Sequence, residues 1–119
     1  MRPVALLLIG LVAAIHAYIV VLEMLLWQKP LGRKVFRTTV EQARQTATLA
    51  ANQGLYNGFL AAGLVWSLVG SAERERPVAT FFLCCVAIAG LYGAATVSRR
   101  ILLVQTVPAL AALATLWLG

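Results

Sequence analysis

The chain has 119 residues, of which 61% are hydrophobic and 12% are charged, and its formal net charge is +6. Soluble domains carry about 25% charged residues, so this composition argues against a soluble globular domain and indicates a single small membrane domain over residues 1–119. The basic residues lie in short segments between apolar runs, which is typical of membrane loops. Nucleic acid is therefore not expected as a partner.

Four apolar runs follow one another along the chain. The first covers about residues 4–27, and a membrane-spanning helix needs about 20 residues. Arg2 before an apolar run also resembles a secretory signal, but the apolar character continues well past Ala14, which favours a retained transmembrane helix. The other runs cover about residues 46–70, 78–97 and 101–118. The expected fold is all-α, a transmembrane four-helix bundle, with Pro108 kinking the last helix or opening its hydrogen-bond ladder.

Residues 28–45 form the one long connection between these runs. Pro30 and Gly32 are expected to end the first helix. Thr38 and Glu41 have the spacing of a capping box, which predicts that the second helix extends back to about residue 38. An ordinary solvated basic loop is the alternative. Residues 71–77 are expected to form a short loop, which makes the second and third helices antiparallel neighbours.

The basic residues predict one orientation in the membrane. Arginine and lysine are enriched in cytoplasmic loops. Both termini are therefore expected outside a bacterial inner membrane, with residues 32–44 inside. One side would hold seven basic residues, namely Lys29, Arg33, Lys34, Arg37, Arg44, Arg99 and Arg100, against Arg2, Arg74 and Arg76 on the other.

Polar residues within the apolar runs indicate a candidate site. His16, Glu23 and Trp27 share one helix face, although His16 and Glu23 are too far apart along the axis to touch. Polar side chains cluster in the cytoplasmic halves of the runs, where they predict a polar cavity. His16 and Glu23 are expected to act as a catalytic acid–base pair, with ligand-binding residues Asn52, Gln53, Tyr56, Asn57, Tyr92 and Gln105. No metal site is expected.

Two simpler interpretations remain open for these residues. Amide side chains in membrane helices often only bond neighbouring helices, and Glu23 could extend to the interface towards Lys29 or Arg33. Gly54 and Gly58 form a Gly-x-x-x-Gly pair, which predicts a close helix contact within the monomer or between subunits. A homo-oligomer is expected, because four short helices enclose little volume for a polar cavity.

Several blocks of sequence resemble a family of small bacterial four-span membrane proteins of unknown function. The resemblance rests on the segments His16-x-Tyr18, Glu23…Trp27, Asn52–Ala61 and Ala89–Gly93, with Gln105. It covers nearly the whole chain and implies a four-span membrane protein without implying an activity. A looser similarity links Arg44…Asn52 to the membrane-associated eicosanoid and glutathione metabolism superfamily. That superfamily has an acidic residue soon after the asparagine, where this chain has Gly54-Leu55-Tyr56.

Three functions are compatible with these patterns. The first is a membrane protein that binds or converts a small amphipathic molecule entering from the lipid or the cytoplasm. The second is a small proton-coupled exporter that uses Glu23 as its proton site. The third is a structural or subunit-type membrane protein without a site. The cofactor is unknown, although His16 as a neutral imidazole could ligate haem iron.

Overall fold

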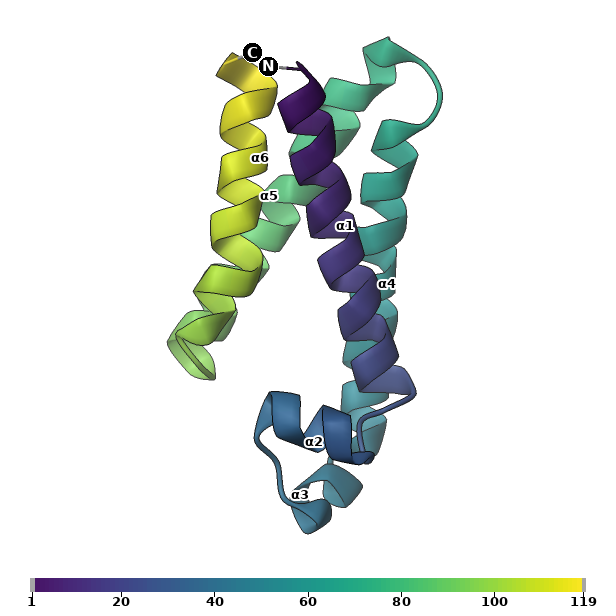
Figure 1. The fold of residues 1–119 in the computed structure, drawn as a ribbon, viewed down its shortest axis with the longest axis vertical. Helices are drawn as coiled ribbons and strands as arrows, with labels where there is room; N and C mark the ends of the chain where they lie inside the picture. Colours follow the sequence, from purple (N-terminus) through teal and green to yellow (C-terminus); the bar gives the residue numbers. More distant parts are fainter. Residues whose placement is uncertain (1, 119) are drawn as a thin grey trace. The chain divides into compact units, whose positions relative to one another are not determined.

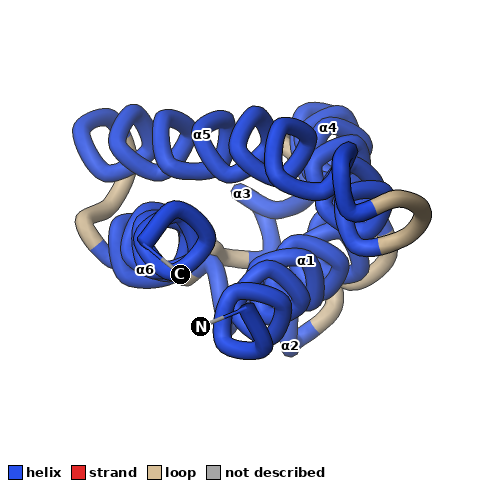
Figure 2. The backbone as a smooth tube through the Cα atoms, turned by 90° about the horizontal axis from the view of Figure 1, so that it is seen from above, coloured by secondary structure: helices blue, strands red, loops and turns tan. Residues whose placement is uncertain are grey.

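The computed structural model describes residues 2–118, and every regular element in that range is helical (Figure 2). The all-α prediction is therefore confirmed. The elements in chain order are α1 (Arg2–Met24), α2 (Pro30–Phe36), α3 (Val40–Gln45), α4 (Ala47–Leu68), α5 (Ala72–Thr96), the π-helical turn η1 (Leu102–Thr106) and α6 (Val107–Leu118).

Two helix boundaries differ from those expected. The first helix ends at Met24, and residues 25–27 form turns. The loop predicted at residues 71–77 is wrong, because α5 already begins at Ala72 and includes Pro77. The alanine, glutamate and arginine residues of its first turns favour helix strongly, and Glu73 and Glu75 interact favourably with the helix N-terminus. These contributions outweigh the hydrogen bond that Pro77 removes.

The second predicted helix is also interrupted. The segment from residue 40 is helical, as expected, but α3 ends at Gln45. The next residue, Thr46, has a ψ of 8° and leaves the helical region before α4 begins. The predicted capping box at Thr38 and Glu41 is wrong by one residue. Thr39 is the cap: its side chain accepts from the Gln42 N–H at 3.0 Å, and the Gln42 side chain accepts from the Thr39 N–H at 2.9 Å. Either glutamine or glutamate can occupy the third helical position of a capping box. The sequence was therefore compatible with Thr38 paired with Glu41 and with Thr39 paired with Gln42.

The described chain divides into two compact units. The first comprises residues 2–15 and 60–118, and the second comprises residues 16–59. The helices α1 and α4 contribute residues to both units, and a single domain over residues 1–119 stays a prediction.

In the first unit, α5 packs antiparallel against η1 and α6 (Figure 1). The Thr106 hydroxyl donates to the Ala87 carbonyl at 3.0 Å, and the Trp117 indole N–H donates to the Thr80 hydroxyl at 2.9 Å. From the first bond to the second, the position rises from Thr106 to Trp117 along η1 and α6 but falls from Ala87 to Thr80 along α5. The two segments therefore run antiparallel. Close approach at this contact requires Gly90, because a Cβ there would overlap the Thr106 side chain.

The π-helical turn lies immediately before Pro108, where an opened hydrogen-bond ladder was expected. Proline has no N–H to donate to the preceding turn, and one-turn π segments are a common way to accommodate such a defect. The turn at Leu102–Thr106 confirms this expectation.

In the second unit, the short helices α2 and α3 connect the end of α1 to the start of α4 (Figure 1). The sequence did not reveal α2. Pro30 begins it, in the position where a missing N–H costs nothing. Gly32 permits the close approach of its backbone to the Leu26 carbonyl, which a Cβ would overlap. The Trp27 and Phe36 rings lie 4.9 Å apart, and the Trp27 N–H donates to the Thr46 hydroxyl at 3.1 Å.

Two described helices are long and apolar enough to cross a membrane, judged by length and composition. They are Pro3–Met24, with mean hydropathy 2.7, and Ala72–Thr96, with mean hydropathy 2.1. The segment Leu102–Leu118 is apolar but shorter. In α4 the amides of Asn52, Gln53 and Asn57 lower the hydropathy.

Candidate functional site

The candidate site in the second unit is built around Glu23, in the last turn of α1. Its side chain is buried, with 6% of its surface exposed. The Asn57 amide, on α4, donates a hydrogen bond to the Glu23 carboxylate at 2.7 Å. Burying a carboxylate is costly unless it is hydrogen-bonded or paired, and Asn57 supplies one such bond. The expected contact between Glu23 and an α4 amide is therefore present.

Glycine lets α4 approach α1 at this point. A Cβ on Gly54 would overlap the Met24 side chain and lie 3.2 Å from the Glu23 Cβ, so a larger residue would separate the helices. Gly58 is less constrained, because a Cβ there would be 3.7 Å from Val20, an ordinary contact distance. Of the predicted pair, Gly54 thus makes the close contact.

The position of Gly54 also explains which amide meets Glu23. At 100° per residue, Asn57 lies about 60° from Gly54 around the helix, whereas Asn52 lies about 160° away. Asn52 and Gln53 are exposed accordingly. Combining the glycine pair with helical spacing could have identified Asn57 from the sequence alone.

A hollow of about 380 Å³ opens beside the carboxylate. Its volume lies near the lower end of the range for ligand pockets, about 300–1,000 Å³. Its lining residues are Glu23, Met24, Leu25, Trp27, Gln28, Lys29 and Ala47. The wall therefore combines a carboxylate, an ammonium group, an amide, an indole and three apolar side chains.

Most of this lining was not predicted. Met24, Leu25, Gln28 and Lys29 follow Glu23 directly, where the chain turns out of α1. The available sequence signal was Pro30, because a chain break soon after a buried carboxylate brings its sequence neighbours around it. Trp27, which was expected on the same helix face as Glu23, lines the hollow, and its indole N–H donates to the Thr46 hydroxyl.

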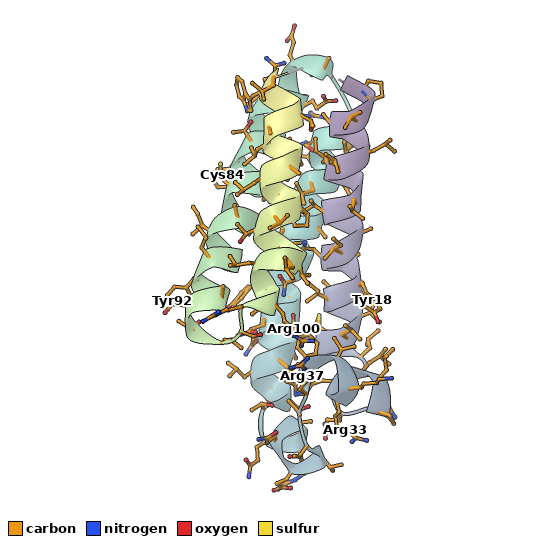
Figure 3. The ribbon with its side chains drawn as sticks, turned by 60° about the vertical axis from the view of Figure 1, so that its left-hand side comes forward. Tyr18, Arg33, Arg37, Cys84, Tyr92 and Arg100 are labelled. Carbon is orange, nitrogen blue, oxygen red and sulfur yellow. The ribbon has the colours of Figure 1, made fainter. Side chains whose placement is uncertain are left out.

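The remaining predicted residues occupy different surroundings. His16 is fully buried, about 10 Å along the α1 axis from Glu23. Tyr56 is exposed, with its ring 6.1 Å from the ring of Phe59. Tyr92 and Gln105 belong to the first unit. Tyr92 points away from the helices (Figure 3), and Gln105 is half-buried. Their participation in a site with Glu23 stays a prediction.

The fold and this site define a small all-helical protein with two helices apolar enough to cross a membrane and a buried carboxylate bonded to a half-buried amide. The chain belongs to a protein family of unknown function, DUF1304, which it matches over residues 10–117. The expected relationship to a family of unknown function is confirmed at that level.

One relative comes from a bacterium. The chain is 31% identical, over 97 residues, to the uncharacterized protein YpaA of Lactococcus lactis subsp. lactis (strain IL1403), covering 80% of this chain and 81% of that protein. No solved structure is significantly similar to the chain.

Proposed function

We propose that this chain is a four-span integral membrane protein that binds a small amphipathic molecule beside Glu23. The observation that carries the binding proposal is the part-buried Glu23–Asn57 hydrogen bond at the edge of an open hollow. An ionisable side chain within a membrane helix is a functional candidate by default, because its burial is costly.

Membrane insertion is supported by the small buried share of the apolar helices. Only 28% of an apolar 18-residue stretch in each of the two candidate spans is buried within the protein, whereas the core helix of a soluble protein is mostly buried. Large apolar side chains on these helices and on η1 are correspondingly exposed, including Leu7 at 74%, Ile88 at 65% and Leu103 at 70%. Surfaces of this kind mark contact with lipid or with other proteins.

The chemistry of the hollow suits an amphipathic ligand. Glu23 can accept a hydrogen bond from a polar head group, while Met24, Leu25 and Trp27 offer apolar contact. Lys29 provides a positive charge at the same hollow and suits a head group that also carries an acceptor. His16 lies too far from Glu23 for direct proton exchange, so any joint acid–base role would proceed through the ligand or water.

The proposed setting is a bacterial inner membrane with both termini outside, in a homo-oligomer. The excess of basic residues between α1 and α4 supports this orientation. The exposed apolar faces of the spans supply surface for lipid and for other subunits.

The binding proposal is tested by Glu23→Gln, with Glu41→Gln as the matched control, because Glu41 is exposed and outside the hollow. Both variants are purified in a mild detergent, and co-purifying small molecules are detected by native mass spectrometry. We expect a bound molecule with the wild type and with Glu41→Gln, and its loss from a folded Glu23→Gln protein. Equal occupancy in all three would refute the site and favour the view that the pair only packs helices.

Membrane insertion has its own test. Membranes that contain the wild-type protein are washed in alkaline carbonate, which releases peripheral proteins. We expect the protein to stay in the pellet, and its release would show that the apolar helices do not span the bilayer.

A further inference from the structure

A concentrated positive charge lies on and around α2. Four cationic residues occupy positions 29–37, and no acidic residue lies between Glu23 and Glu41. The four are Lys29, Arg33, Lys34 and Arg37. The next cation, Arg44, forms a salt bridge with Glu41 instead. This bond holds the pKa of Glu41 below its ordinary value, so the pair stays charged and neutralises itself at neutral pH. Lys29, Arg33, Lys34 and Arg37 form no salt bridge within residues 2–118, and we call these four cations with Leu31 the basic face.

The basic face points away from the rest of the second unit, because the other side of α2 is packed against that unit. The opposite side of α2 is held against its own unit by Gly32, close to the Leu26 carbonyl, and by Phe36, against the ring of Trp27. Lys34 is exposed, and Leu31, one helical turn before it, is 45% exposed. Arg33 and Arg37 extend from the same segment (Figure 3). The basic face therefore presents cations together with an apolar side chain.

Arg37 has a backbone conformation that points to a role for its side chain. It ends α2 in the left-handed region, with φ 56° and ψ 47°. Among residues 2–118, Arg37 is the one non-glycine residue whose φ is positive. Glycine is the usual residue at this helix-ending position, because a Cβ is strained there. An exposed arginine at this position lowers the stability of the fold relative to glycine and places a positive charge on the surface.

We propose that the basic face binds the anionic phosphate head groups of the surrounding membrane lipids. Clusters of four to eight lysines and arginines next to a membrane helix attract anionic lipids, and the basic face begins five residues after α1 ends. The exposed Leu31 favours lipid over nucleic acid, since an apolar side chain within a basic helix face inserts at the acyl boundary. This inference rests on the membrane insertion proposed above and does not depend on Glu23.

The test uses the full chain in mixed micelles that contain equal amounts of phosphatidylglycerol and phosphatidylcholine. Native mass spectrometry gives the ratio of the two retained lipids. We expect phosphatidylglycerol to be enriched on the wild type, and the enrichment to fall on the order of fivefold for each cation removed, in Lys34→Gln and in Arg37→Gly. Added salt should lower the enrichment, because exposed charges are screened.

Two controls separate lipid binding from folding. Arg37→Gly relieves the strained backbone, so its thermal stability should equal or exceed that of the wild type while its lipid selectivity falls. The double variant Glu41→Gln/Arg44→Gln removes a neutral pair from the same connection and should retain the wild-type ratio.

Three results would overturn the inference: no enrichment on the wild type, unchanged enrichment in both single variants, or equal loss in the control. If a short single-stranded oligonucleotide binds with the same dependence on Lys34 and Arg37 while the lipid ratio is constant, the face recognises nucleic acid and the inference is wrong. Release by carbonate would refute membrane insertion itself. An integral protein without the lipid preference would refute this inference alone.

Discussion

Asn57→Leu is expected to destabilise the contact between α1 and α4. The substitution keeps the branching and the number of side-chain heavy atoms but removes the amide that donates to Glu23 at 2.7 Å. Losing a hydrogen bond to a charged group costs about 1.5–3 kcal/mol, whereas hydrogen bonds between membrane helices average about 0.6 kcal/mol and reach about 1.7 kcal/mol. We expect a loss in the free energy of unfolding of about 0.6–3 kcal/mol, with values above about 1.7 indicating an ionised Glu23.

A double-mutant cycle isolates this bond. Glu23→Met removes the acceptor, and Glu23→Met/Asn57→Leu replaces both partners by apolar groups. Removing one partner leaves a buried polar group unsatisfied, while removing both can be nearly neutral. The double variant should therefore be more stable than Asn57→Leu alone.

The assay is unfolding in detergent micelles with increasing dodecyl sulfate, followed by the circular dichroism of the helices. Asn52→Leu is the control, because Asn52 is an exposed amide on the same helix, and it should change stability by less than about 0.5 kcal/mol. A coupling energy indistinguishable from zero, or an Asn57→Leu protein as stable as the control, would refute the assigned role of the bond.

Gly54→Leu should destabilise the protein by about 1–3 kcal/mol through overpacking. Gly58→Ala should be neutral or stabilising by up to about 1 kcal/mol, because Gly58 has room for a Cβ. Equal melting profiles of the two variants would contradict the close contact at Gly54. Thr39→Ala should weaken α3 by about 1 kcal/mol, measured by amide hydrogen exchange in α3. Thr38→Val should not weaken it, because the Thr38 hydroxyl is buried without a partner among the described residues; the reverse order would show that the assigned cap is wrong. A cysteine at position 34, in a background without the native cysteines, should react with a membrane-impermeant reagent only after the cytoplasmic face is exposed, and labelling of intact cells would disprove the orientation.

The sequence alone determined the features that depend on short stretches of chain. Long apolar runs without strand alternation indicate helices, because each backbone must satisfy its own hydrogen bonds in an apolar environment. The opening before Pro108 followed from the missing N–H of proline, which is a property of one residue. The contact between Glu23 and an α4 amide followed from the cost of burying a carboxylate without a partner.

Only the tertiary structure decided which local alternative is used. Residues 30–36 have an acceptable helix signal beside a proline, and whether they are helical depends on packing, as the contact of Gly32 with the Leu26 carbonyl shows. The choice between Thr38 and Thr39 as cap depends on how this segment faces the rest of its unit. The hollow beside Glu23 has the same origin: it exists because the chain leaves α1 at Met24 and turns back past Lys29 towards Ala47. Pro30 marks a chain break, but the course of the turn depends on long-range contacts, such as the bond from the Trp27 indole to the Thr46 hydroxyl, which no local pattern encodes.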